Sequence, residues 1–130
     1  MNLLPGRVLD VGALVDVAVA KTQYSRSIVA HCIYRGGGIC VPSTALAAVL
    51  SISPFATQLE LFELISDEAV KVDDFTNGKV GDIADILDGS RDVIAGHVVW
   101  CSRFTNWPVL TDRAAELKTF DPYVQTDSLV

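Results

Sequence analysis

The sequence is short of basic residues. Its 130 residues include 10 Lys and Arg against 16 Asp and Glu, which gives a formal net charge of −6 and a pI near 4.6. Proteins that bind nucleic acid nonspecifically need a basic face that releases counterions from the phosphates. The charge therefore argues against broad nucleic-acid binding, although it leaves room for a small basic site or for a metal that bridges to phosphate.

The sequence also lacks paired cysteines and long hydrophobic runs. Cys32, Cys40 and Cys101 show no CxxC spacing, so no zinc or redox motif is evident. An odd cysteine count without a secretory signal is typical of a reducing cytosol, and we expect the three thiols to be small buried hydrophobic groups. No apolar run reaches the roughly 18 residues of a membrane span. We therefore predict a soluble, cytoplasmic protein with no membrane partner.

Short apolar runs alternate along the chain with segments of helical periodicity. The predicted strands are "RVLD" (7–10), "GICVP" (38–42), "AVKVDDF" (69–75) and "WPVLT" (107–111), and "DPYVQTDSLV" (121–130) is predicted to be a turn that leads into a last edge strand. The predicted helices cover residues 12–19, 22–35 (capped by Thr22), 43–51, 54–65 (capped by Ser53), 76–88, 90–107 and 112–120. Alternation of this kind predicts one α/β domain over residues 1–130, with a mostly parallel sheet covered by helices on both faces.

Two acids directly follow predicted strands. Asp10 ends "RVLD", and Asp112 comes after "WPVLT". Sites in open α/β sheets form outside the carboxyl ends of the strands, so these two side chains are candidates to converge. Clustered carboxylates are the hard oxygen ligands of Mg²⁺ and Mn²⁺, and two such ions support in-line phosphodiester hydrolysis. Asp10 and Asp112 are therefore the candidate catalytic and metal-binding residues.

Three stretches together resemble a known family. "RVLDVGALVD", "CVPSTALAAVL" and "GHVVWCSRFTNWPVLTDRAAELKTFDP" have the order and spacing of a PIN-like domain, as in the VapC-type toxin ribonucleases of bacterial toxin–antitoxin pairs. The resemblance covers Val8 to about Leu129. It implies a three-layer α/β/α sandwich with 4–5 strands, often dimeric. It also implies a Mg²⁺- or Mn²⁺-dependent endoribonuclease site of three or four acids, which a partner antitoxin inhibits.

Carried over residue by residue, the acidic site of this family is incomplete. The first acid falls on Asp10. The second, a Glu in the helix after the "VP" turn, falls on Ala48, and the third, an Asp that opens the long helix, falls on Ala95 or Gly96. The resemblance therefore implies that two of the usual ligands are apolar here.

The fourth acid of the family lies just after the "VLT" strand. In "VLTDR", Asp112 comes one place early and Arg113 stands at the expected position. An arginine there would repel a metal cation. Asp92 and Asp16 lie near enough in sequence to be substitute ligands, whereas Asp10 without a metal would cap the helix that follows it.

Other surfaces are candidates for binding. Lys21 and Arg26 form the best candidate phosphate contact near Asp10. The helices at 22–35 and 54–65 are candidate faces for a homodimer or a partner such as an antitoxin or regulator, because Phe55, Leu59 and Phe62 would be unusually apolar if exposed to solvent.

Three hypotheses for function follow, and the acidic charge argues against the third, a nucleic-acid-binding module without cleavage. In the first, the chain is a catalytically degenerate PIN-like protein that needs no cofactor and is used for protein binding or regulation. In the second, it is an active Mg²⁺- or Mn²⁺-dependent endoribonuclease with a reduced acidic site, and RNA is then its substrate. Convergence of three carboxylates within reach of one metal would favour the second hypothesis. An Arg113-filled pocket would favour the first.

Overall fold

The computed structural model describes residues 6–129, which form a five-stranded sheet between two groups of helices. Residues 1–5 and 130 of the predicted domain lie outside this range, so its boundaries stay a prediction. The strands are β1 (Arg7–Leu9), β2 (Ile39–Pro42), β3 (Val70–Asp73), β4 (Val109–Thr111) and β5 (Thr126–Ser128). The helices are α1 (Val11–Val19), α2 (Tyr24–Tyr34), α3 (Ser43–Ile52), α4 (Phe55–Ile65), α5 (Val80–Leu87), α6 (Val93–Thr105) and α7 (Ala114–Phe120), with a 3₁₀ turn at Asn77–Lys79.

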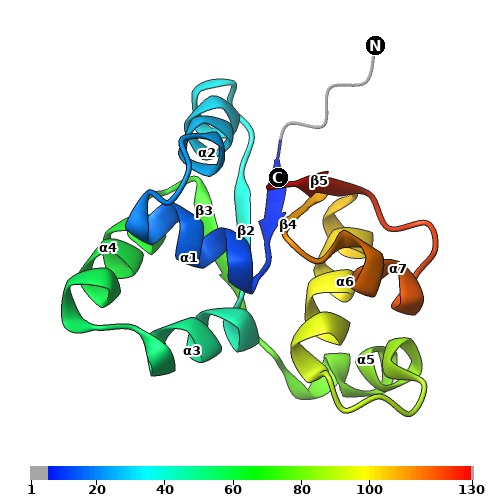
Figure 1. Ribbon diagram of the computed structural model, residues 1–130. Coiled ribbons are helices and arrows are strands. Elements are labelled where there is room, and N and C mark those ends of the chain that lie inside the picture. The colour runs from blue at the N-terminus through cyan, green and yellow to red at the C-terminus, as the bar shows by residue number, and fades with distance from the viewer. Residues whose placement is uncertain (1–5, 130) are drawn as a thin grey trace.

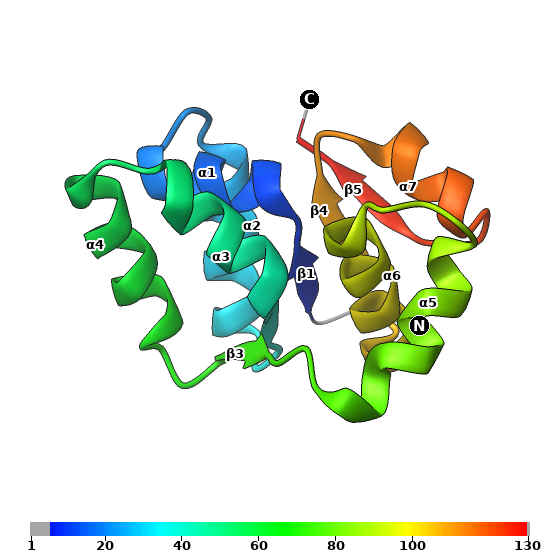
Figure 2. The ribbon, with the colours of Figure 1, turned by 90° about the horizontal axis from the view of Figure 1, so that it is seen from below.

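The strand order is β3-β2-β1-β4-β5, and every neighbouring pair is parallel. Helices α1 to α4 lie on one side of the sheet and α5 to α7 on the other, as two perpendicular views show (Figures 1 and 2). The predicted α/β fold with a parallel sheet and helices on both faces is confirmed. The five predicted strands are all present.

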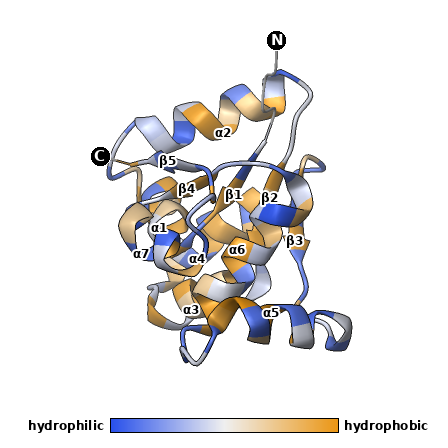
Figure 3. Cartoon of the chain, turned by 90° about the vertical axis from the view of Figure 1, so that its right-hand side faces the viewer, coloured by the Kyte–Doolittle hydropathy of each residue, from blue (hydrophilic) through white to orange (hydrophobic). Residues whose placement is uncertain are grey.

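Each face of the sheet has its own hydrophobic core. On the side of α1 to α4, Leu9, Leu14 and Ile39 are completely buried. On the other side, Val8 and Val109 pack against Val98 of α6. Adjacent strand residues thus point to opposite faces, which is why the strands are apolar throughout rather than alternating. Figure 3 shows hydrophobic residues predominating in α6 and in the strands beside it.

The two predicted helix caps, Thr22 and Ser53, are wrong. Helix α2 begins at Tyr24, and Thr22 instead bonds to Asp16. Helix α4 begins at Phe55 with Pro54 in the capping position, while the Ser53 hydroxyl donates to the carbonyl oxygen of Val49 at the end of α3. In both cases the hydroxyl satisfies a neighbouring turn rather than the helix that follows.

The order of the strands brings two chain segments together at the centre of the sheet. β1 pairs with β4 in the register Leu9 to Leu110, so Asp10, the first residue after β1, lies beside Thr111, the last residue of β4. Within residues 6–129, no helix is long and apolar enough to cross a membrane.

Candidate functional site

Asp10 lies at the carboxyl edge of the sheet and is completely buried. Its backbone is extended, and its side chain accepts from the backbone N–H of Val11, so Asp10 is the N-cap of α1. The capping interpretation of Asp10 is therefore confirmed. Capping is not the only role of the Asp10 carboxylate, because it accepts three further hydrogen bonds.

All the acceptor positions of the Asp10 carboxylate are used. Oδ1 accepts from Val11 N (2.9 Å) and Arg113 Nη2 (2.9 Å). Oδ2 accepts from the Thr111 hydroxyl (2.8 Å) and Arg113 Nε (2.7 Å). A carboxylate has about four lone-pair sites. None is left to coordinate a metal ion in this arrangement.

Arg113 joins Asp10 to a second acid. Its third guanidinium nitrogen, Nη1, donates to Asp92 Oδ2 at 3.0 Å. The Arg113 side chain is only 20% exposed, and the hydrogen bond to Asp10 is the main reason why the pKa of its guanidinium is raised above the usual value. The guanidinium therefore stays positively charged between the two carboxylates.

Asp92, a candidate substitute ligand, lies directly before α6. It is the N-cap of α6, with its Oδ1 accepting from the N–H of Ala95. Ala95 and Gly96, the positions at which the resemblance places the third acid of the family, lie near the start of α6 and carry no carboxylate. Ala95 is completely buried, and a Cβ on Gly96 would come within 2.8 Å of Leu87 on α5. Gly96 thus serves the close packing of α5 on α6.

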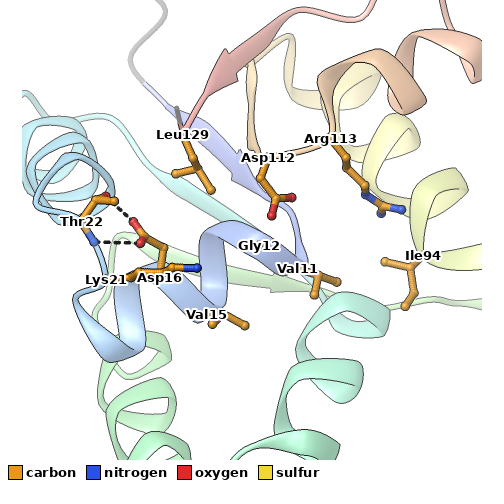
Figure 4. A pocket seen from close by; sticks show the side chains of 10 residues that line it. All are labelled: Val11, Gly12, Val15, Asp16, Lys21, Thr22, Ile94, Asp112, Arg113 and Leu129. Carbon is orange, nitrogen blue, oxygen red and sulfur yellow. Dashed lines mark hydrogen bonds between the residues drawn. The ribbon is translucent and has the colours of Figure 1, made fainter.

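Asp112 is not part of the Asp10 cluster. Its side chain is exposed and lies over Gly12, where an added Cβ would come within 2.5 Å of the Asp112 carboxyl group. Figure 4 shows this carboxylate above the first turn of α1, with Arg113 turned away from it. Within residues 6–129, no hydrogen bond joins Asp112 to Asp10 or Asp92.

The remaining predicted ligand positions supply no third carboxylate. Ala48 is half-buried in α3 and carries only a methyl group. Asp16 lies two turns further along α1, where it accepts from the N–H and hydroxyl of Thr22 (Figure 4). Burial acts to raise the pKa of Asp16, but hydrogen bonds, including those from Thr22, outweigh it and lower the pKa. Asp16 thus holds the turn between α1 and α2.

Lys21 and Arg26, the candidate phosphate contacts, lie in different places. Lys21 lines the same pocket as Asp112 and Arg113. Arg26 instead donates to the carbonyl oxygens of Val17 and Ala18 near the end of α1. The structure therefore does not bring the two cations together at Asp10.

The pocket beside the acidic cluster is largely apolar. It has a volume of about 530 Å³ and opens over α1 between Arg113 and the α1–α2 turn (Figure 4). Apolar side chains from three parts of the chain line it: Val11, Val15, Ile94 and Leu129. Such a pocket suits an apolar segment better than a phosphate backbone.

The predicted interface residues on α4 are exposed. Phe55, Leu59 and Phe62 have 72%, 52% and 50% of their surface accessible, and Ile52 at the end of α3 is 74% exposed. These four residues are called the α3–α4 apolar face below.

The donor set does not fit Mg²⁺ or Mn²⁺. The two acids that approach each other share a guanidinium, and the described residues place no third carboxylate beside them. Sequence reasoning missed two contributors here, Thr111 and the pairing of Arg113 with Asp10. The sequence "VLTDR" could have indicated both, since Thr111 ends a strand next to the one that Asp10 follows and Arg113 comes two residues later.

Comparisons with known proteins show the fold. No family model matches the sequence, and no curated protein matches it. Among solved structures, a chain in the crystal structure of VapBC2 from Rickettsia felis bound to a DNA fragment from their promoter superposes with a TM-score of 0.68. The alignment has 18% sequence identity and covers 96% of this chain and 99% of that chain. The predicted PIN-like fold is thereby confirmed.

Proposed function

We propose that this chain is a VapC-like PIN domain that has lost its nuclease activity and works by binding a protein partner. The observation that carries the proposal is the guanidinium of Arg113, which bonds to both Asp10 and Asp92. The arginine supplies the positive charge that the two carboxylates need for stability, and it does so without a metal.

An arginine cannot replace the chemistry of a metal ion. A bound Mg²⁺ or Mn²⁺ polarises a phosphoryl oxygen and lowers the pKa of a coordinated water. A guanidinium has only N–H donors, coordinates no water as a Lewis acid and does not give up a proton near neutral pH. The Asp10–Arg113–Asp92 cluster therefore stabilises the carboxyl edge of the sheet rather than activating a nucleophile.

The partner we propose is an antitoxin-like protein. The solved structure with the same fold is of VapBC2 bound to a DNA fragment from their promoter, and the VapC-type proteins that the sequence resembles are paired with antitoxins. The apolar pocket over α1 gives such a partner a place for a hydrophobic segment, and Lys21 and Asp112 at its margins give it polar contacts.

The first test is a titration of Mn²⁺ into the purified protein, followed by calorimetry and by the melting temperature. We expect no binding to the wild-type chain. Arg113→Asn should gain a Mn²⁺-dependent rise in melting temperature, because Asp10 and Asp92 are then free to bind the ion. The double variant Asp10→Asn/Arg113→Asn is the matched control and should not respond.

The second hypothesis, an active endoribonuclease with a reduced site, is favoured by one observation. Asp10, after the end of β1, and Asp92, at the start of α6, both accept hydrogen bonds from the guanidinium of Arg113. Tight Mn²⁺ binding to the wild-type chain, lost in Asp10→Asn and accompanied by RNA cleavage, would establish this hypothesis and reject the inactive one.

The partner proposal has its own test. The chain is co-expressed with VapB-type antitoxins, and complex formation is followed by size-exclusion chromatography. Val15→Glu places a charge on the wall of the pocket and should abolish the complex, whereas Tyr123→Ser, at a 90% exposed residue, should not. A complex that tolerates Val15→Glu would place the partner elsewhere.

A further inference from the structure

A second cluster of polar side chains lies apart from the acidic site, between β3 and α6. Asp73 is the last residue of β3, while His97 and Cys101 are four residues apart on one face of α6. Asp73 Oδ2 lies 2.8 Å from His97 Nε2 and 3.4 Å from Cys101 Sγ. The three potential ligand atoms all lie within 4.8 Å of one another.

We propose that Asp73, His97 and Cys101 bind a divalent transition-metal ion of the zinc type. One thiolate, one imidazole and one carboxylate are a mixed ligand set that Zn²⁺ accepts and that Mg²⁺ and Ca²⁺ disfavour. Three protein ligands leave a fourth position for water. The site is independent of the function proposed above.

The distances suit a bound ion after a small adjustment. With Zn–N and Zn–O near 2.0–2.2 Å and Zn–S near 2.3 Å in a tetrahedron, the oxygen–sulfur distance is about 3.5 Å and the oxygen–nitrogen distance about 3.3 Å. The observed oxygen–sulfur distance of 3.4 Å already agrees. The oxygen–nitrogen distance of 2.8 Å must open by about half an ångström, which a rotation of the Asp73 carboxylate provides.

His97 is held in place by a partner on its other nitrogen. Its Nδ1 lies 2.8 Å from the hydroxyl of Thr44 on α3. Most metal-binding histidines donate their second N–H to an oxygen in this way, which fixes the ring and its tautomer. A hydroxyl both donates and accepts, so Thr44 serves either tautomer of His97. The imidazole is therefore oriented before a metal arrives.

The protons of the cluster balance in a simple way. Burial is the main cause that lowers the pKa of His97, so the ring is neutral near pH 7. The Cys101 thiol is protonated, because the neighbouring Cys40 thiol and burial raise its pKa. On metal binding, the His97 proton moves from Nε2 to Nδ1, where the resulting N–H donates a hydrogen bond to the Thr44 hydroxyl. The Cys101 proton is released to solvent, so one proton leaves for each ion bound.

Lys79 is the competitor of the metal. Its ammonium group lies 2.9 Å and 2.8 Å from the two Asp73 oxygens and also packs over the ring of Trp100. Because an ammonium and a metal ion compete for Asp73, we expect Lys79→Gln to strengthen metal binding. The Asp73 side chain is 20% exposed, so solvent reaches the cluster from its side while His97 and Cys101 stay buried.

The test is a titration of Co²⁺ into the full chain under reducing conditions. Co²⁺ bound by a thiolate gives a near-ultraviolet charge-transfer absorption, and Zn²⁺ should abolish it by competition. Cys101→Ala should lose the absorption, whereas Cys32→Ala, which removes a buried thiol from the other face of the sheet, should keep it. Thr44→Val should weaken binding by about 10–100-fold.

Two results would overturn the proposal. One is the absence of a thiolate band in the folded wild-type chain at a saturating Co²⁺ concentration. The other is a band that persists in Cys101→Ala. Neither depends on the Asp10 cluster, because Mn²⁺ is the probe there and no cysteine takes part. Failure of this proposal and failure of the inactive-nuclease proposal are therefore distinguishable.

Discussion

Arg113 and Asp10 are joined by two parallel hydrogen bonds, from Nε to Oδ2 at 2.7 Å and from Nη2 to Oδ1 at 2.9 Å. The pair links the end of β1 to the start of α7, 103 residues later in the chain. Asp10 is completely buried, so its charge has to be compensated within the protein. The guanidinium of Arg113 compensates this charge.

Arg113→Ala should destabilise the protein strongly. Removing one partner of a buried ion pair leaves an uncompensated charge and costs about 3–5 kcal/mol. We expect the midpoint of urea unfolding to fall while the slope of the transition stays unchanged, since the folded state keeps its compactness.

The matched control is Arg103→Ala. Arg103 also forms an ion pair, with Asp121, but its side chain is 53% exposed. Exposed pairs contribute about 0–1 kcal/mol. Equal losses in the two variants would mean that Asp10 does not depend on Arg113, and the structural role assigned to the arginine would be rejected.

Gly96→Ala should destabilise the packing of α5 on α6. The added Cβ would lie 2.8 Å from Leu87 Cδ2 and 3.0 Å from Ile83 Cγ2. Overpacking of this kind costs about 1–3 kcal/mol, less what the helix gains from replacing a glycine. Thermal unfolding measures the difference.

Gly81→Ala is the control within the neighbouring helix. An added Cβ at Gly81 meets no atom within 4 Å, so alanine should stabilise α5 by about 0.5–1 kcal/mol. If both alanine variants are stabilised, the space around Gly96 is larger than the structure indicates.

The fold was predictable because its signals are local. Apolar runs at Val8–Leu9 and Ile39–Val41 mark strands that are buried on both faces, and parallel strands connected by helices leave few alternative topologies. The helix starts were less predictable. Thr22 and Ser53 have the chemistry of caps, but each bonds to a different turn, and the sequence does not record which neighbour competes for a hydroxyl.

The site was predictable only in part, because its contacts are long-range. Asp10 follows a strand and is correctly placed at the carboxyl edge of the sheet. The position of Asp92 depends on where α6 begins, and helix ends are the least certain part of a sequence-based prediction. The pairing of Arg113 with Asp10 depends on side-chain directions across β1 and β4, which no spacing in the sequence specifies.

Charged substitutions on the α3–α4 apolar face should change the oligomeric state. Exposed hydrophobic side chains on neighbouring helices mark an interface, and a homodimer is the predicted assembly. We expect the wild-type chain to sediment as a dimer and Phe62→Asp to sediment as a monomer in analytical ultracentrifugation. Tyr123→Ser also removes an exposed aromatic side chain, but one that lies outside this face, so it should leave the dimer intact. A wild-type chain that is monomeric at high concentration would contradict the homodimer.

Asp16→Asn should reduce stability near neutral pH and flatten its dependence on acid. Asp16 is buried, and its carboxylate accepts two hydrogen bonds from Thr22. Burial acts to raise its pKa, but the hydrogen bonds lower it below the ordinary value of 3.8 in the folded state. As the pH falls, the carboxylate in the unfolded state is therefore protonated before the carboxylate in the folded state. This stabilisation is complete above pH 3.8 and is lost as the pH falls through the lower pKa of the folded state.

The measurement for Asp16 is the free energy of unfolding from pH 7 down to pH 2. The variant should be less stable than wild type by about 1–3 kcal/mol at pH 7, and the difference should shrink in the acid range because wild type loses this contribution there. Asp85→Asn, at an exposed residue of α5, should run parallel to wild type throughout. A constant offset for Asp16→Asn at every pH would mean that the carboxylate charge does not matter and that only the shape of the side chain holds the α1–α2 turn.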